Sequence, residues 1–544
     1  MKIINGLHFN NIRGDVFGGI TSAIVAIPLS LAFGMASGLG PQAGLFSAIC
    51  VGFFAAIFGG SPAQISGPNG PITVAMAAVV FTYANDPVTI FTIVMLSGVF
   101  QLIFGFSKIG GYISLMPFPV ISGFMSGVGG IIILMHIPPL LGLEKTSGGV
   151  LSVIVDLPEY IANTNVGALI IGVISIMVVF FTPKKISSMV PPQLIAITFA
   201  TIISILFFKD IPTIGNIDVT SFPDLYMPSI NLDIFQDIIS AAFIIALIGS
   251  IDSLLTGIIA ETMTKNKYDP DKELIGQGLG NIICGMVGGI AGCGGTTRTI
   301  TNIKAGGRTP ISGMLHSVII LAVLLGLGSI ISIIPIAALA GILIKIGFSI
   351  IDWGYIKRCN RAPKASVICM FIVLILCISI NLVVAVAVGI VLSSLLLVKR
   401  MADLELSLMK ATHSGDQLDG TISEIDKNLL TQSQGRVELI TFSGPLSFGA
   451  AREMARRITS RDECDAVILD LSGVTFMDTS TALMLEDSIQ DMQEKFIHLF
   501  IVGGNDKVID VLNRLDVLSK LLPDHIYKDR TEALYHAVHV STDF

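Results

Sequence analysis

Apolar runs long enough to cross a bilayer recur through residues 14–402, and they constrain the fold more than any other feature of this sequence. Because 52% of the residues are hydrophobic, only 13% are charged and the mean hydropathy is +0.80, the composition excludes a soluble enzyme. Charged residues become frequent only after residue 402. The sequence therefore predicts a polytopic α-helical membrane protein that continues into a soluble C-terminal domain.

We count fourteen transmembrane segments, two of them short or polar. With a cytoplasmic N-terminus, most lysine and arginine residues fall in connections on the cytoplasmic side, and the proposed outer loops hold only Lys145 and Lys209. An even number of segments also places the C-terminus in the cytoplasm. The predicted segments are residues 15–36, 41–60, 68–84, 88–107, 112–137, 165–183, 189–208, 236–262, 274–292, 296–306, 311–330, 332–350, 365–380 and 382–399.

An internal repeat divides the membrane part. Residues 44–60 resemble residues 278–295, and a glycine-rich polar break follows each copy, at residues 66–73 and 294–301. Seven segments separate the copies, and because seven is odd, the copies have opposite membrane orientations. We predict inverted repeats over about residues 14–208 and 234–402, which is the pattern of a secondary transporter.

The two breaks have the composition of an anion site. Pro68 and Pro71 prevent a continuous helix, and Asn69 can cap or coordinate. Gly294 and the glycines around it allow close backbone approach before a short helix opens at Thr296. Two half-helices that start near the midplane from opposite sides would direct free N–H groups at a small oxyanion between them.

Asp252 is the only charged residue in the apolar stretch 241–260. A carboxylate at bilayer depth costs several kcal/mol, so it needs a partner or a function. Thr256 lies one helical turn further along the same face, and the pair can ligate a hard cation or carry a proton. An ion pair with a neighbouring helix is the structural alternative.

Arg298 lies one turn inside the second half-helix. Its charge could raise the positive potential of the anion site, or pair with Asp252 when no ion is bound. It could equally form a structural pair with a neighbouring helix. The sequence leaves these three interpretations open.

Residues 403–435 have poor periodicity and are interpreted as a linker, and residues 436–544 as a small α/β domain. Strands are predicted at 437–443, 465–472 and 497–503, with amphipathic helices at 450–458, 479–492 and 507–515. The domain has no Walker loop, no GxGxxG and no set of catalytic side chains, so neither an enzyme nor a bound cofactor is expected. No basic stripe points to nucleic acid.

Five motifs give the chain a specific resemblance: residues 14–34, 66–73, 249–264, 272–281 and 297–310. With them, the chain from residue 9 onwards resembles the SulP family of anion transporters, and its C-terminal part resembles the STAS domain of that family. The resemblance implies core and gate subdomains that move against each other, and a homodimer to which the STAS domains contribute. Residues 7–15 and 350–353 fit the family's sodium-dependent bicarbonate transporters.

That group implies roles for individual residues. Its sodium site matches Asp252, Thr256 and the backbone at Gly294. Its bicarbonate site matches the first break, here Asn69, together with Gly295 and Thr296. Two departures concern the anion: the group has threonine at the position of Asn69, and it lacks an arginine at the position of Arg298.

A further resemblance concerns regulation. In STAS domains of anti-sigma-factor antagonists, a serine at the strand-to-helix turn is phosphorylated, and the matching residues here are Thr479 and Ser480. A helix cap is the alternative interpretation of this turn.

Together these features predict a bacterial inner-membrane symporter that takes up bicarbonate with Na⁺ as the coupling ion. Residues 1–13 form its cytoplasmic N-terminus, residues 14–402 its transport domain, and an unknown cytoplasmic partner would bind its STAS domain. The alternative is a transporter of sulfate or another small oxyanion, proton-coupled through Asp252. A transporter-like sensor that signals through its STAS domain belongs to a third class.

Overall fold

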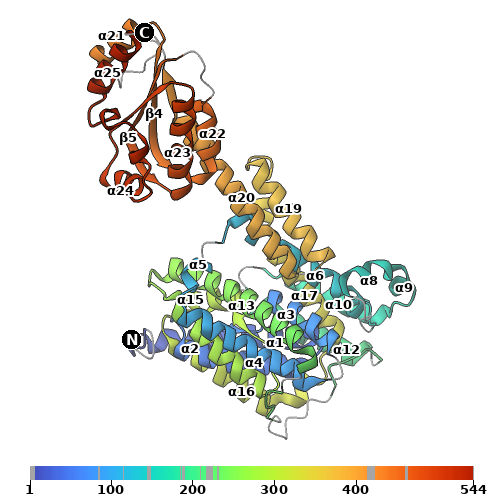
Figure 1. The fold of residues 1–544 in the computed structure, drawn as a ribbon. Helices are drawn as coiled ribbons and strands as arrows, with labels where there is room; N and C mark the ends of the chain where they lie inside the picture. The colour runs from blue at the N-terminus through green and yellow to red at the C-terminus, as the bar shows by residue number, and fades with distance from the viewer. Residues whose placement is uncertain are drawn as a thin grey trace. The chain divides into compact units, whose positions relative to one another are not determined.

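The computed structural model describes residues 6–83, 86–113, 116–143, 149–183, 186, 190–208, 210–215, 225–229, 232–380, 382–412, 423–459 and 464–542. These form two compact units, Met1–Ser393 and Ser394–Phe544 (Figure 1). Some lysines used in the charge argument lie outside the described residues, namely Lys2, Lys145, Lys184, Lys185 and Lys209.

Each predicted membrane segment overlaps a helix, although the bounds differ by several residues in places, as where the helix predicted over residues 274–292 ends at Met286. The helices are α1 (Ile12–Ser37), α2 (Pro41–Phe58), α3 (Gly70–Thr82), α4 (Pro87–Phe106), α6 (Phe118–Met135), α10 (Val166–Phe181), α12 (Pro192–Phe207), α13 (Phe235–Thr264), α14 (Pro270–Met286), α15 (Thr296–Lys304), α16 (Pro310–Ile331), α17 (Ile336–Ile350), α19 (Lys364–Ser379) and α20 (Leu382–Leu408). In the described part of the chain, six of them are long and apolar enough to cross a membrane by themselves: α1, α2, α4, α6, α13 and α20. Short connecting helices are α5 (Gly110–Ile113), α7 (Ile137–Leu140), α8 (Gly149–Val155), α9 (Leu157–Ala162), α18 (Trp353–Ile356) and the 3₁₀ turn η1 (Leu232–Ile234).

Local chemistry explains where several of these helices begin and end. Proline occupies the first turn of α2, α4, α12 and α14, where its fixed φ suits the helix and its missing N–H costs nothing. The side chains of Asp86 and Asp269 cap α4 and α14 by accepting from Thr89 N and Lys272 N. Helix α1 ends at Gly38, whose φ of 88° lies in the left-handed region that glycine adopts without strain.

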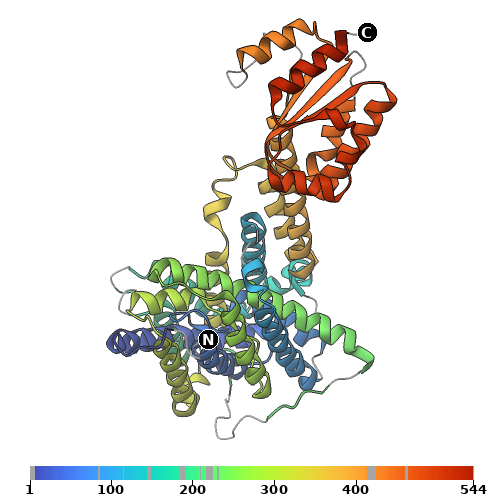
Figure 2. The same ribbon diagram turned by 60° about the vertical axis from the view of Figure 1, so that its left-hand side comes forward.

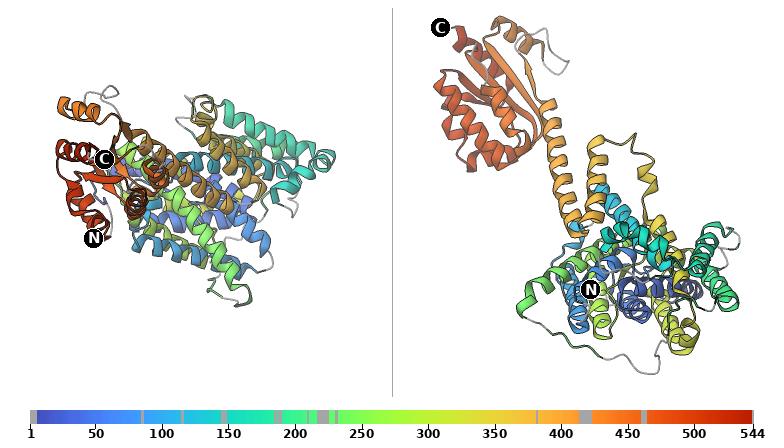
Figure 3. Two further views of the ribbon diagram at one scale, coloured as in Figure 1. Left: turned by 45° about the horizontal axis from the view of Figure 1, so that its top comes forward. Right: turned by 90° about the vertical axis from the view of Figure 1, so that its right-hand side faces the viewer.

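The helices of the first unit pack in two groups. In one group, α14 packs against α2 and α4, α16 against α1 and α2, and α13 against α3, α4 and α15. In the other, α6 packs against α17 and α19, and α10 against α12 and α17. Figures 1 and 3 show α10 to one side of the helices nearest the N-terminus. This arrangement has the two subdomains that the family resemblance implies.

The second unit is a five-stranded sheet of order β3-β4-β5-β6-β7, in which β3 runs antiparallel to β4 and the remaining pairs are parallel. Helices cover both faces: α22, α23 and α24 pack on one, α21 and α25 on the other (Figure 2). The elements are β3 (Lys410–Thr412), α21 (Glu424–Gln432), β4 (Val437–Leu446), α22 (Phe448–Thr459), β5 (Ala466–Met477), α23 (Thr479–Glu494), β6 (His498–Val502), α24 (Asp506–Arg514), 3₁₀ turns η3 (Leu518–Lys520) and η4 (Pro523–His525), β7 (Ile526–Tyr527) and α25 (Arg530–Thr542).

Residues 403–435, which we interpreted as a linker, contain regular secondary structure. Helix α20 continues to Leu408, and residues 403–435 also contain β3 and α21, while residues 413–422 lie outside the described part. The two elements are too short to show a hydrophobic period. The division between the units falls at Ser393 and Ser394, within α20, and no helix-breaking residue marks it.

Candidate functional site

The two polar breaks of the membrane unit pair with each other. Strand β1 (Ser66–Gly67) and strand β2 (Cys293–Gly294) are antiparallel, with Ser66 opposite Gly294 and Gly67 opposite Cys293. Just beyond the ladder, Gly295 N donates to Ile65 O at 2.8 Å. Helices α3 and α15 therefore begin next to each other, from segments that belong to opposite repeats.

Helix α13 places Asp252 against both breaks. The Oδ2 atom of this buried carboxylate accepts from Asn69 Nδ2 at 2.6 Å and from the Cys293 thiol at 3.2 Å. Asn69 comes from the first break and Cys293 from the second. The carboxylate has no ion-pair partner in the described residues, so the structural alternative of a neighbouring-helix ion pair is not what this conformation contains.

Thr256 and the second break complete the polar cluster. The Thr256 hydroxyl lies 3.3 Å from Gly294 O, to which it donates, and 2.8 Å from the Thr296 hydroxyl. Gly294 N donates to Ser253 Oγ at 2.9 Å, which fastens β2 to α13. The carboxylate, hydroxyl and carbonyl predicted to ligate Na⁺ are thus brought together, and oxygen atoms of these kinds are the ligands that hard cations take.

The predicted anion residues lie in the same cluster. Asn69 is the N-cap of α3, where its Oδ1 accepts from Gly70 N at 3.0 Å. Gly295 is the N-cap of α15, and Thr296 is the first residue of that helix. The N–H groups in the first turn of α15, and the positive ends of both helix dipoles, suit an oxyanion.

Arg298 is buried between the breaks. Its Nη2 donates to Pro68 O at 2.6 Å, and a Cβ built on Gly295 or Gly67 would lie 2.5 Å from its Nε or 2.7 Å from its Nη1. No carboxylate among the described residues forms an ion pair with it, and Nη1 has no hydrogen-bond partner there. Of the three interpretations, this placement favours the one in which Arg298 raises the positive potential of the site.

The sequence analysis missed a second buried carboxylate. Glu273 accepts from Gly60 N and Ser61 N at 3.0 Å each, from Gln64 Nε2 at 2.9 Å and from Gln277 Nε2 at 2.8 Å. Gln277 also donates to Ser66 Oγ at 2.6 Å, so this network holds the chain that leads into β1. Glu273 and Gln277 are four residues apart and so lie on the same face of α14, and this spacing was a signal that could have identified Glu273 as part of a polar network.

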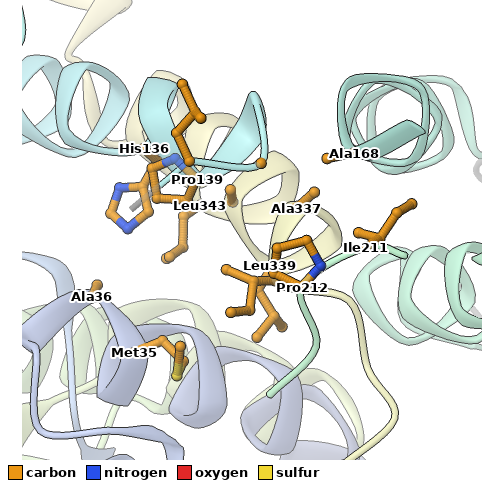
Figure 4. Close-up of a pocket in the computed structure, with 14 residues that line it drawn as sticks. Met35, Ala36, His136, Pro139, Ala168, Ile211, Pro212, Ala337, Leu339 and Leu343 are labelled. Carbon is orange, nitrogen blue, oxygen red and sulfur yellow. The ribbon is translucent and has the colours of Figure 1, made fainter. Parts of the chain in front are cut away.

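A cavity of about 440 Å³ lies between α1 and α17, and Figure 4 shows its lining. Met35 and Ala36 of α1 face Ala337, Leu339 and Leu343 of α17 across it, with His136 at one side. None of the predicted site residues lines it. A smaller adjoining pocket shares Ala36, His136 and Leu343 with the cavity and reaches Thr73, in the first turn of α3.

Thr479 and Ser480 lie in the second unit. Both are exposed in the first turn of α23, whose N-cap Asp478 accepts from Thr481 N at 2.8 Å. The turn therefore has the cap that the alternative interpretation requires. Phosphorylation of either residue stays a prediction.

The geometry and the motifs define a class of protein. The chain matches the model of the sulfate permease family over residues 12–373 and that of the STAS domain over residues 428–533. It belongs to the SulP family, and it is a multi-pass membrane transporter rather than an enzyme.

Individual relatives narrow the comparison. The chain is 40% identical to the bicarbonate transporter BicA of Picosynechococcus over 99% of this chain and 97% of that one, and 39% identical to BicA of Synechocystis over 99% and 96%. A putative sulfate transporter of Bacillus subtilis is 28% identical over 97% and 98%.

Solved structures agree with this fold. The transmembrane domain of a cyanobacterial BicA aligns at 40% identity with a TM-score of 0.66, covering 72% of this chain and 99% of that one. The murine Slc26a9 anion transporter aligns with a TM-score of 0.83 over 98% and 92%, and at 19% identity it shows the fold alone.

Proposed function

We propose that this protein is a symporter that carries bicarbonate into the cell together with Na⁺. Identity of about 40% to two proteins named as bicarbonate transporters, over nearly the whole chain, supports the substrate. The observation that carries the coupling is the direct contact between Asp252 of α13 and the N-cap of α3, Asn69. A cation site and an anion site that share this contact lie within one polar cluster.

Electrostatics gives the reason for coupling. Asp252, Thr256 and the Gly294 carbonyl would bind Na⁺, while Asn69, Gly295 and Thr296 would receive the anion beside the two helix starts. The buried charges of Asp252 and Arg298 sum to zero, so in a low-dielectric interior either ion alone leaves a net charge, whereas the two ions together leave none. Each ion therefore favours the conformation that holds the other.

The setting of the protein belongs to the same proposal. The cytoplasmic placement of both termini follows from the distribution of lysine and arginine, and the inner membrane of a bacterium is the site of such uptake. We further propose that the protein is a homodimer to which the STAS domains contribute. A cytoplasmic partner would regulate it by binding the STAS domain.

Uptake by the purified protein in liposomes tests the proposal. Labelled bicarbonate and labelled sulfate are supplied with an inward Na⁺ gradient or with K⁺ in its place. We expect bicarbonate entry that requires Na⁺, and Asp252→Asn should abolish the Na⁺ requirement together with most uptake. Asp237→Asn is the matched control, because Asp237 is exposed on the first turn of the same helix.

The contrary results are specific. Sulfate entry that is indifferent to Na⁺ and driven by a pH gradient would replace bicarbonate with sulfate and make Asp252 a proton carrier. The buried charge of Arg298 is the observation that favours this second candidate, since a dianion gains more from a fixed positive charge. Full activity of Asp252→Asn would reject the coupling mechanism.

A further inference from the structure

The side chain of Asn69 touches both halves of the proposed site. Its Nδ2 donates to Asp252 Oδ2 at 2.6 Å and lies 3.3 Å from Gly294 O, while its Oδ1 accepts from Gly70 N at 3.0 Å. One amide group therefore contacts two proposed Na⁺ ligands with its donor end and the first helical N–H of α3 with its acceptor end.

These contacts settle the orientation of the amide. The carboxylate and the carbonyl both need a donor, which only the –NH₂ end supplies, and Gly70 N needs an acceptor, which only the carbonyl end supplies. A flipped amide would set its oxygen atom against the oxygen atoms of Asp252 and Gly294, and its –NH₂ group against the N–H of Gly70. The –NH₂ group thus faces the oxygen atoms of Asp252 and Gly294.

A cation bound to Asp252 Oδ2 and the Gly294 carbonyl would compete with this –NH₂ group for the same two oxygen atoms. Sodium bound by Asp252 and the Gly294 carbonyl would approach the oxygen atoms that Asn69 Nδ2 now contacts. Hydrogen bonds to a charged acceptor are among the stronger ones, so giving this one up weakens the apparent affinity for the cation. Asn69 is in this sense an internal competitor of Na⁺.

Releasing Asn69 has a second effect. Once its –NH₂ group leaves the carboxylate, a hydrogen-bond donor becomes free at the start of α3, beside the N–H groups proposed to receive the anion. The carboxylate of Asp252 no longer accepts from this donor, so an oxyanion can accept from it instead.

We propose that Asn69 is the residue that links the two ions: it contacts Asp252 and Gly294 until Na⁺ displaces it, and it then donates to the anion. The proposal rests on the proposed function, because it assumes the cation site. Nothing covalent changes, and the exchange needs only that Nδ2 turn from one set of acceptors to another.

Asn69→Thr is the decisive variant. Threonine can still cap α3 through its hydroxyl, but its shorter side chain cannot bridge Asp252 and Gly294 with one donor. Asn69→Ser repeats the experiment should the threonine variant fold poorly. Asn165→Thr is the matched control, because Asn165 caps α10 by accepting from Ala168 N, and it belongs to neither ion site.

Two measurements on the full-length protein are needed. The first is the Na⁺ concentration that gives half-maximal thermal stabilisation, with K⁺ as reference and no bicarbonate present. The second is the KM for bicarbonate uptake at several Na⁺ concentrations. We expect Asn69→Thr to lower the half-maximal Na⁺ concentration about tenfold, the effect of one hydrogen bond to a charged group. We also expect the bicarbonate KM to depend less on Na⁺ without becoming independent of it, because the charges of the two ions still couple them when residue 69 is threonine.

The outcomes separate the two proposals. If the wild-type protein responds to Na⁺ and Asn69→Thr and Asn69→Ser behave like it in both measurements, Asn69 does not link the ions, and the cation site stands. If the wild-type protein shows no response to Na⁺ beyond that to K⁺, the proposed function fails, and the role of Asn69 fails with it. A shift of equal size in Asn165→Thr would also overturn the role of Asn69.

Discussion

Ser66 lies opposite Gly294 in a two-residue antiparallel ladder, although the two residues belong to opposite repeats of the chain. The repeats meet through their backbones at this point, where α13 supplies Asp252, Ser253 and Thr256. We therefore expect even small side-chain changes next to the ladder to reduce transport.

Gly67→Ala tests how tightly the ladder is built. The φ of Gly67 is +148°, and a Cβ there would lie 2.7 Å from Arg298 Nη1 and 3.0 Å from Ala48 Cα. We expect a loss of about 1–3 kcal/mol of stability and a clear fall in uptake, because strain adds to the displacement of Arg298. Thermal unfolding and liposome uptake measure the two effects.

Gly326→Ala supplies the control for that experiment. No atom lies within 4 Å of a Cβ built on Gly326, which is in helix α16. Alanine should keep or slightly raise stability there, since glycine is the poorer helix former. Equal behaviour of the two variants would mean that the ladder tolerates a side chain at residue 67.

Glu273→Gln tests the second buried carboxylate. The amide keeps the shape of the side chain but offers only one acceptor oxygen, so the backbone N–H groups of Gly60 and Ser61, or the amides of Gln64 and Gln277, lose their acceptor. Each orphaned donor costs about 1–3 kcal/mol, and we expect a lower unfolding temperature. Unchanged stability would show that the network does not hold the approach to β1.

Arg530→Ala should destabilise the second unit. The guanidinium of Arg530 contacts Asp470 Oδ2 through Nε at 2.7 Å and through Nη2 at 2.6 Å, and the Asp470 side chain is only 2% exposed. Removing the arginine leaves a buried charge without its partner, which costs about 3–5 kcal/mol. Urea unfolding, followed by the protease sensitivity of residues 424–542, measures the loss.

Arg514→Ala is the matched control for Arg530. Its ion pair with Asp510 joins side chains that are 77% and 52% exposed, and exposed pairs of this kind contribute about 0.5 kcal/mol or less. A loss as large as that of Arg530→Ala would contradict the distinction between buried and exposed pairs in this unit.

The second unit should also lose stability in mild acid. Burial lowers the pKa of His525 below its usual value of 6.5; His498 lowers it further, and the carbonyl of Leu499 and the charge of Asp524 oppose the shift. Below pH 6.5 the unfolded chain binds a proton that the folded chain resists, so stability present above that pH is lost as the pH falls. In His525→Gln the urea concentration at the unfolding midpoint should change less between pH 8 and pH 5 than in the wild-type protein. An unchanged dependence of that midpoint on pH would exclude His525 as the cause.

The fold was largely predictable because long periodic and apolar segments carry their own signal. All three predicted strands and all three predicted helices of the C-terminal domain occur as β4, β5, β6, α22, α23 and α24. The interpretation of residues 403–435 as a linker missed β3 and α21. Those elements depend on pairing with β4 and packing on α25, which local sequence does not encode.

The site was predictable to a different extent. One helical turn places Asp252 and Thr256 on a common face, and the glycine-rich composition marked both breaks. The contacts between Asn69 and Asp252 and between Arg298 and Pro68 join residues far apart in sequence, and periodicity has no information about such pairs. Glu273 escaped notice because a carboxylate near a helix start resembles an ordinary first-turn acid.

The ladder between β1 and β2 has one more consequence. Two backbones joined by hydrogen bonds cannot slide or part without losing them, so we expect α3 and α15 to move together. If access to the ions changes sides by a movement of these two helices, the contact between α3 and α6 is one that has to change. The cavity between α1 and α17, lined in part by Ala36, Ala337 and Leu343, leaves space beside the helices that such a movement would shift.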